Sequence, residues 1–371
     1  MIMNIKELPI FMLSSFGHAG VDWTHSLLDN HSQILIMPAF SFFRTIYKLE
    51  KINKIDLKKF ENSKYASKIL TDLFYKDAAY YNTKRRQFIF NKEQREIFQN
   101  ELEVFFDNNN ENVIKKLFYG LHVAFCKVHN IDLHKKKCIV MHEHVAWHYE
   151  KYIKYFDAKA ILIFRDPKAV LGGGILRMKS SNVSKKIQSN QMDAMILHMV
   201  SAFNIYLKRK GSNKVFSLQN EKMHIDLNLE MKKLCIWMNI EFENSLLKQT
   251  FLGNNWLGES SYLAVDELEK LPPENYYDAE EVKKRWKTIL LSKDILLIEI
   301  IFRKFIKEFN YPFENKINLL NIFYGYLSFF FRYQFQEKYF LNKYLIIMRN
   351  LIRRISIVVF KEKVTNIFNF R

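Results

Sequence analysis

The chain of 371 residues is 49% hydrophobic, and its 57 lysines and arginines against 39 aspartates and glutamates give a formal net charge of +18. This composition excludes a disordered chain and allows a large core in one elaborated domain or two. Three widely spaced cysteines without a CxxC pair exclude a disulfide framework and a cysteine zinc site. No zinc-finger, homeodomain or RNP-like motif supports a nucleic-acid partner.

The first predicted elements are a strand, a turn and a helix within residues 10–31 (IFMLSSFGHAGVDWTHSLLDNH). An apolar run at 10–13 predicts the strand, and small residues up to Gly20 predict the turn. Such a turn presents backbone N–H groups at a helix N-terminus, where phosphate binds. A Walker A loop is excluded because no Lys-Ser/Thr pair follows Gly20, and the dinucleotide fingerprint is incomplete. A tight turn without a ligand is the alternative.

Further predicted strands at 34–37, 138–141 and 158–164 alternate with helical segments, the longest at about 42–130. This alternation predicts an α/β fold, with a central, mostly parallel sheet flanked by helices, a helical insert at about 42–130 and a helical C-terminal extension. We expect an α/β domain over 1–314 and the extension over 315–371. Since ligands bind at the carboxyl ends of parallel strands, residues 15–22, 142–144 and Arg165 are expected to share one crevice.

These segments resemble, in order and spacing, the motifs of sulfotransferases that use 3′-phosphoadenosine 5′-phosphosulfate (PAPS), over about 7–312. Residues 16–23 and 27–31 fall on the family's G-x-x-[RK]-S-G-T-T loop and its LLDxHP helix end. Residues 158–170 resemble the strand that ends in RDPR. Residues 214–223, 231–240 and 285–292 resemble the later YEDL, FLG[IL] and WRxxLS stretches. The resemblance implies a P-loop-like sulfotransferase fold with PAPS as sulfuryl donor.

The resemblance also implies which residues contact PAPS. Arg165 is expected to hold the 3′-phosphate, with Gly173 and Arg285 as further nucleotide contacts, and Lys168 is expected at the surface. The 5′-phosphosulfate contacts are expected in the first loop, from Ser15, Phe16, Gly17, His18, Ala19, Gly20, Val21, Asp22 and Trp23.

The first loop departs from the family pattern. His18 replaces the usual Arg or Lys, and Ala19, Val21 and Asp22 stand where the family has hydroxyl residues. Two like charges about 4 Å apart repel by roughly 4 kcal/mol at an effective dielectric constant of 20. Asp22 is therefore expected to point away from the phosphate or to pair with a cation, and we favour it as a helix N-cap.

A second chemical cluster is formed by His142, Glu143, His144 and His148. In the family a histidine base lies near this position, so His144, His142 or Glu143 is a candidate base, and a protonated His18 is a candidate for assisting transfer. A zinc site made from His142, His144 and His148 lacks a fourth ligand, and no metal is expected. Hydrogen-bonded residues at a strand end are the third interpretation.

The segment 316–371 carries ten Lys and Arg against two Glu, a net charge of +8. Its apolar run at 319–331 is too short to span a bilayer, but a basic amphipathic stretch at 345–360 is typical of helices that lie on an anionic membrane surface. Packing on the main domain or in a dimer interface is the alternative. No signal peptide precedes the first strand, so we expect a cytoplasmic location, with peripheral contact at the inner membrane face.

Two hypotheses for the whole chain follow. The first is a PAPS-dependent sulfotransferase that modifies a hydroxyl of a glycan, lipid or other metabolite. The second is an inactive protein of the same fold that binds a nucleotide or an acidic partner. The missing hydroxyls at Ala19, Val21 and Gly173 favour the second, whereas Arg165 and the histidine cluster favour the first.

Overall fold

The computed structural model describes residues 5–38, 41–52, 55–81, 91–180, 185–256 and 278–331. Its centre is a five-stranded sheet in the order β2-β3-β1-β4-β5, in which every strand pair is parallel. The strands are β1 (Ile10–Ser14), β2 (Ile34–Ile36), β3 (Cys138–Glu143), β4 (Lys159–Phe164) and β5 (Val215–Gln219). The predicted α/β fold with a parallel sheet is confirmed.

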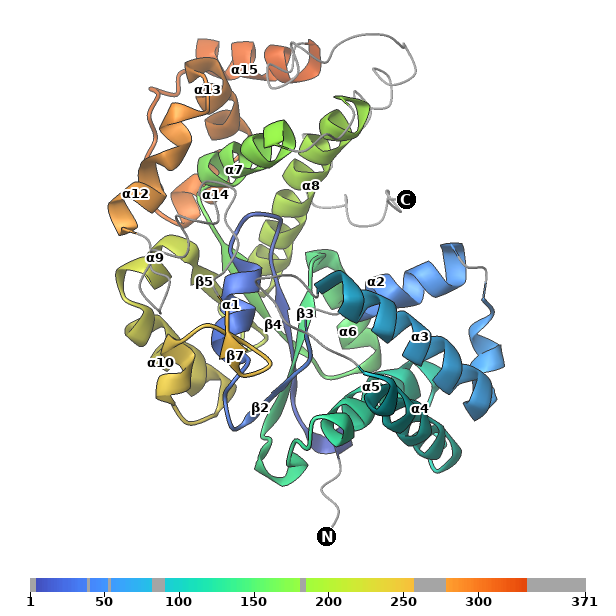
Figure 1. Ribbon diagram of the computed structural model, residues 1–371. Coiled ribbons are helices and arrows are strands. Elements are labelled where there is room, and N and C mark those ends of the chain that lie inside the picture. Colours follow the sequence, from blue (N-terminus) through green and yellow to red (C-terminus); the bar gives the residue numbers. More distant parts are fainter. Residues whose placement is uncertain are drawn as a thin grey trace.

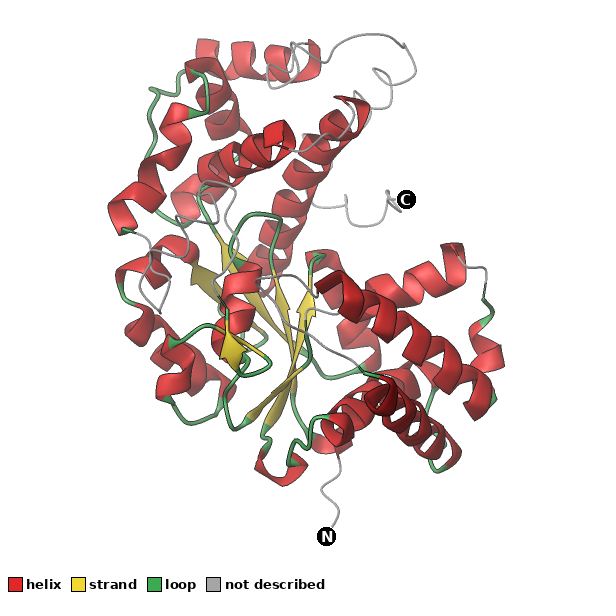
Figure 2. Cartoon of the chain, in the orientation of Figure 1, coloured by secondary structure: helices red, strands yellow, loops and turns green. Residues whose placement is uncertain are grey.

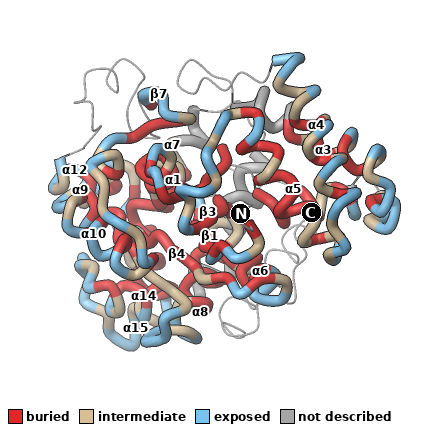
Figure 3. The backbone as a smooth tube through the Cα atoms, turned by 90° about the horizontal axis from the view of Figure 1, so that it is seen from below, coloured by how far each residue is buried: buried red, intermediate tan, exposed pale blue. Residues whose placement is uncertain are grey.

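Helices cover both faces of this sheet, as Figures 1 and 2 show. One face packs against α1 (Val21–Leu28), α9 (Asn220–Ile225) and α10 (Leu227–Met238). The opposite face packs mainly against α5 (Val113–Val128), α6 (Tyr149–Tyr155), α7 (Pro167–Ser180) and α8 (Lys185–Arg209). Because both faces are covered, the strands are near-continuous apolar runs, and Figure 3 shows β1, β3 and β4 as buried chain.

The other helices form two groups at the sides of the sheet (Figure 1). The insert between β2 and β3 contains α2 (Phe42–Tyr47), α3 (Ser63–Tyr81) and α4 (Lys92–Asp107), together with α5. The carboxyl-terminal group contains α12 (Ala279–Lys284), α13 (Ser292–Ile301), α14 (Arg303–Glu308) and α15 (Leu319–Phe331). A short antiparallel hairpin, β6 (Thr250–Phe251) and β7 (Asn254–Asn255), stands outside the central sheet. The basic stretch at 345–360 lies outside the described residues.

The strand order gives the sheet a switch point between β1 and β4. After β1 the chain crosses to β2 on one side, and after β4 it continues to β5 on the other side. Neighbouring strands whose connections leave in opposite directions form a switch point, where α/β proteins bind ligands at the carboxyl edge. In register, Ser14 at the end of β1 lies beside Glu143 of β3 and Leu162 of β4. The three strand ends are therefore close together, as the sequence predicts.

Candidate functional site

The loop between β1 and α1 is built around a glycine in the left-handed region. Gly20 has φ +96° and is the N-cap of α1, and a Cβ atom there would collide with the Asn220 side chain. The N–H of Ala19 donates to the carbonyl oxygen of Phe16 over 3.2 Å, which closes the turn. The prediction that Asp22 is the N-cap is wrong, because Asp22 lies in the first helical turn instead.

The side chains of this loop divide into buried and partly exposed ones. Phe16, 1% exposed, packs against Phe164 and Phe305, and Ala19 is also buried. The buried Ser15 hydroxyl donates to the Phe16 carbonyl oxygen over 3.0 Å. These side chains anchor the turn, so an anion here would be bound mainly by the backbone N–H groups from Gly17 onward and by the positive end of α1.

Arg165, at the end of β4, contacts the loop directly. Its Nη1 donates to the carbonyl oxygen of His18 over 3.0 Å. Nearby, the indole of Trp23 stacks on His224 of α9, with ring centroids 4.3 Å apart and an interplanar angle of 11°. Burial, and then the positive charges of Arg165 and Arg285, lower the pKa of His224 to about 3. Both guanidinium groups therefore act at one place, beside the predicted phosphate loop.

This arrangement joins three predicted nucleotide contacts, Trp23, Arg165 and Arg285, from distant parts of the chain. The sequence interpretation missed His224, although it follows a predicted strand. Arg285 also lies 3.6 Å from the exposed carboxylate of Glu281. A half-buried pair of arginines at the mouth of a parallel sheet is suited to a phosphate group, since guanidinium pairs with phosphate through two hydrogen bonds.

The histidines at the end of β3 form the second part of the site. His142 is buried, and its Nδ1 lies 3.2 Å from Nδ1 of His25 on α1. Its Nε2 lies 4.0 Å from Oδ1 of Asp22. The half-buried His144 faces the same side, with its ring centroid 4.5 Å from that of His142. The predicted shared orientation is confirmed, whereas His25 was missed.

Glu143 points to the other side of β3, as strand geometry requires of the residue between them. It is fully buried, accepts a hydrogen bond from the Ser41 hydroxyl and lies 3.1 Å from Nδ1 of His148. His148 is thereby engaged on the Glu143 side of the strand. Among the described residues, the structure groups Asp22, and not His148, with His142 and His144.

The glycine run in α7 brings that helix close to the loop. The helix continues unbroken from Pro167 to Ser180, through Gly172, Gly173 and Gly174. A Cβ atom on Gly174 would press on Met195 of α8 at 2.7 Å and lie 3.8 Å from Cδ2 of His18. Gly173, the next residue toward the loop, is likewise buried. The glycines therefore permit close approach of α7, α8 and His18.

Lys168 is fully buried, which contradicts its expected surface position. Its Nζ donates to the Pro312 carbonyl oxygen over 2.7 Å and lies 3.4 Å from Asp166 and 3.5 Å from Glu299. Burial, only partly offset by the Lys168 charge, raises the pKa of Asp166 to about 6. This network ties the residue after Arg165 to the carboxyl-terminal helices and so holds the strand end in position.

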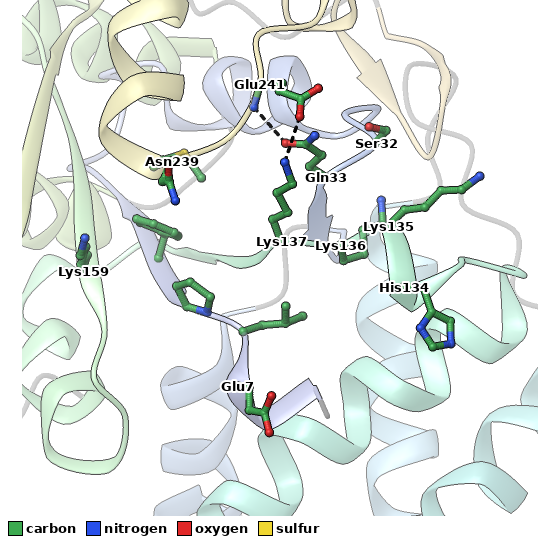
Figure 4. Close-up of a pocket in the computed structure, with 14 residues that line it drawn as sticks. Glu7, Ser32, Gln33, His134, Lys135, Lys136, Lys137, Lys159, Asn239 and Glu241 are labelled. Atoms are coloured by element: carbon green, nitrogen blue, oxygen red, sulfur yellow. Dashed lines mark hydrogen bonds and ion pairs between the residues drawn. The ribbon is translucent and has the colours of Figure 1, made fainter. Parts of the chain in front are cut away.

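A hollow with a volume of about 840 Å³ lies at the amino edge of the sheet (Figure 4). Its walls include Pro9, Lys137 and Lys159, which precede or begin strands. Lys137 pairs with Glu241 over 3.0 Å, and the Glu241 N–H donates to Gln33 over 2.9 Å. The predicted phosphate loop and histidines do not line it. It is therefore separate from the site at the carboxyl edge.

Comparison with known proteins gives weak likenesses. No protein-family model and no curated protein matches the chain. Among solved structures, a sulfotransferase domain from the curacin biosynthetic pathway matches with a TM-score of 0.46 and 13% identity, over 82% of this chain and 99% of that one. A sulfotransferase domain from the olefin synthase of Synechococcus PCC 7002 matches with a TM-score of 0.41 and 12% identity, over 84% of this chain and 98% of that one.

Sulfotransferase STF9 from Mycobacterium avium matches with a TM-score of 0.40 and 14% identity, over 84% of this chain and 79% of that one. TM-scores below 0.5 at such low identity carry no argument about activity. The function therefore has to be argued from the residues of the site.

Proposed function

We propose that this protein is a PAPS-dependent sulfotransferase that transfers a sulfuryl group to a hydroxyl of a glycan, lipid or other metabolite. One observation carries the proposal: Arg165 reaches the β1–α1 loop, where its Nη1 donates to the His18 carbonyl oxygen over 3.0 Å, close to the stacked rings of Trp23 and His224. Arg165 and the loop are the positions at which the sequence resembles the nucleotide contacts of that family. The same edge of the sheet also carries an imidazole pair, His142 and His144.

Binding of the donor would divide between two parts of the site. The N–H groups between Gly17 and Trp23, except that of Ala19, which closes the turn, would hold the 5′-phosphosulfate together with the positive end of α1. His18 would add a charge when protonated. Arg165 and Arg285 would hold the 3′-phosphate. The donor supplies a sulfuryl group on a phosphate leaving group. Hydrogen bonds already directed at that leaving oxygen would stabilise the charge that develops on it.

The acceptor hydroxyl needs a base, and His144 suits this role best. It is half-buried, whereas His142 is 1% exposed and Glu143 faces the far side of β3. A neutral imidazole can take the hydroxyl proton as the oxygen attacks sulfur and the sulfur–oxygen bond to phosphate breaks. Such a base contributes about 10²–10⁴-fold to a rate.

Asp22 does not prevent anion binding in this arrangement. Its carboxylate lies 4.0 Å from Nε2 of His142, so it is directed at the histidine pair. This matches the requirement, set by like-charge repulsion, that Asp22 pair with a cationic partner or turn away from the phosphate.

The alternative is a protein of this fold that binds the nucleotide without transfer. The observation in its favour is the lack of hydroxyl side chains at Ala19, Val21 and Gly173. Backbone donors alone would then provide binding but less stabilisation of the leaving group.

The deciding experiment is calorimetry with adenosine 3′,5′-bisphosphate at low salt, followed by transfer assays with PAPS and an acceptor panel. We expect micromolar binding that Arg165→Ala abolishes. The matched control is Arg95→Ala, which removes an arginine that is 41% exposed and paired with Asp72 on the insert. Absence of wild-type binding overturns the proposal, and binding without transfer selects the alternative.

We also propose that α15 rests on an anionic membrane surface. Its first turns expose Leu319, Leu320 and Phe323 by 84%, 79% and 68%. Residues 316–371, which include α15, have a net charge of +8, which complements anionic lipid. Among the described residues, no helix is long and apolar enough to cross a membrane. A cytoplasmic location stays a prediction.

A further inference from the structure

We propose that Asp22, His142 and His144 form a binding site for one divalent transition-metal ion, for which Zn²⁺ is the fitting example. This inference does not depend on the nucleotide or on sulfuryl transfer. It contradicts the expectation that the protein binds no metal. The zinc site considered from the sequence used His148 as its third ligand. The site proposed here uses the carboxylate of Asp22 in that place.

The geometry brings together three ligand atoms from α1, from β3 and from the loop that follows β3. One atom each from Asp22, His142 and His144 lies within 4.8 Å of the others, and His142 Nε2 is 4.0 Å from Asp22 Oδ1. Ligands bound tetrahedrally at the usual zinc distances lie roughly 3.3 Å apart. Binding of an ion would require side-chain rotation to shorten the present separations, which are up to 4.8 Å.

His25 supports the ligand role of His142. Its Nδ1 lies 3.2 Å from His142 Nδ1, so one of these nitrogens carries the proton that the other accepts. When His142 carries it, Nε2 bears the lone pair, and Nε2 is the atom that faces Asp22. Metal-binding histidines are commonly oriented in this way by a hydrogen bond to the second ring nitrogen.

Two imidazoles and one carboxylate favour a borderline ion such as Zn²⁺ over Mg²⁺ or Ca²⁺, which prefer oxygen ligands. Three protein ligands leave a fourth position for water or an anionic oxygen, as in catalytic zinc sites. Entry is possible because the Asp22 side chain is 40% exposed and His144 is half-buried.

The ion would also offset the Asp22 carboxylate at the N-terminus of α1. A bound ion occupies the imidazole lone pairs, so His144 cannot accept a proton at the same time. This consequence rests on the proposed function: metal binding and the base role of His144 exclude each other.

The test uses the full chain after removal of metal with a chelator. Co²⁺ is added and its visible absorption recorded, Zn²⁺ is then used to displace it, and Zn²⁺ binding is measured by calorimetry. We expect one ion per chain with micromolar affinity or better. We expect Asp22→Asn to weaken binding at least tenfold and His144→Gln to abolish the Co²⁺ spectrum.

The matched controls are Asp132→Asn and His134→Gln, which change the same residue types at the exposed N-cap and within the body of a 3₁₀ helix (Leu133–Lys135) remote from the cluster. They should leave binding unchanged. Equal binding by wild type, Asp22→Asn and His144→Gln, or loss of binding only in the controls, overturns the site and assigns the ion to the surface. A circular dichroism melt of each variant verifies folding.

Adenosine 3′,5′-bisphosphate is titrated separately in the same preparations. Metal binding without nucleotide binding contradicts the proposed function and leaves the metal site standing. Nucleotide binding without metal binding contradicts the metal site and leaves the proposed function standing. The failures of the two proposals are therefore distinguishable.

Discussion

Arg165 and Lys168 are three residues apart, yet they have opposite environments. Arg165 is partly exposed beside the loop, whereas Lys168 is enclosed between Asp166, Glu299 and the Pro312 carbonyl. A buried charge is tolerated only when partners compensate it. Lys168 therefore stabilises the strand end that carries Arg165. It does so through its ion pairs with Asp166 and Glu299.

Replacing Lys168 by Met should destabilise the protein strongly, because Asp166 and Glu299 would lose their shared cation. Removing one partner of a buried ion pair costs about 3–5 kcal/mol. Denaturant unfolding at pH 7 measures the loss. Lys135→Met, at an exposed lysine, is the control and should change stability by less than about 0.5 kcal/mol. Equal stabilities of the two variants would contradict the role of Lys168.

At the scale of elements, the β1–α1 unit combines the carboxyl end of the central strand, a turn with a glycine in the left-handed region and a helix N-terminus. Gly17 and Gly20 appear equivalent in the sequence, but the structure distinguishes them. Gly17 has open space around its Cα, whereas Gly20 has a positive φ and lies against Asn220 of α9. Contact between α1 and α9 thus depends on Gly20.

Gly20→Ala should lower the free energy of unfolding by at least about 1–2 kcal/mol, since an L-residue is strained at this φ and its methyl group meets Asn220. Gly17→Ala should cost little, because nothing lies within 4 Å of the added atom. Chemical denaturation of both variants compares them. A larger loss in Gly17→Ala would show that the turn is built differently.

The exposed face of α15 gives a prediction about surfaces. Full-length protein should float with anionic vesicles, and Leu320→Ser with Phe323→Ser should return it to the soluble fraction. Neutral vesicles should not recruit it. Ile236→Ser is the control, because Ile236 is an apolar side chain 80% exposed on α10. Retention of wild type in the soluble fraction, or a dimer that the double variant dissociates, would contradict membrane contact.

For the whole molecule, buried histidines should set the response to acid. Burial lowers the pKa of His122 and His198 to about 4 and, with Arg165 and Arg285, that of His224 to about 3. The unfolded chain then binds more protons below pH 6.5 than the folded one. The stability that these neutral imidazoles contribute is present above pH 6.5 and is lost as pH falls.

Asp166 acts in the opposite direction, because its folded pKa is raised to about 6. The folded state takes up this proton first, so Asp166 adds stability as pH falls from 6 toward 4. We expect urea unfolding to show a decline in stability between pH 6.5 and 5. Relative to wild type, this decline in the free energy of unfolding should be steeper in Asp166→Asn and shallower in His122→Leu. The His134→Gln variant should show the same decline as wild type. Parallel slopes for all four proteins would contradict this assignment.

Local patterns in the sequence were sufficient for the order of the elements, the parallel sheet and the placement of the loop, the histidine pair and Arg165 at one edge. Apolar runs and small-residue turns are short-range signals, and connections in parallel sheets bring strand ends to the same edge. The shared orientation of His142 and His144 followed from the alternation of side chains along a strand.

Packing between distant segments decided the rest. It buried Lys168, joined Glu143 to Ser41 and His148 behind β3, and brought His25 and His224 into the site. It also directed Asp22 at His142 rather than at the helix cap. Most of these partners are more than 100 positions apart in the chain, with no periodic relation, so their chemistry emerges only when the chain is folded.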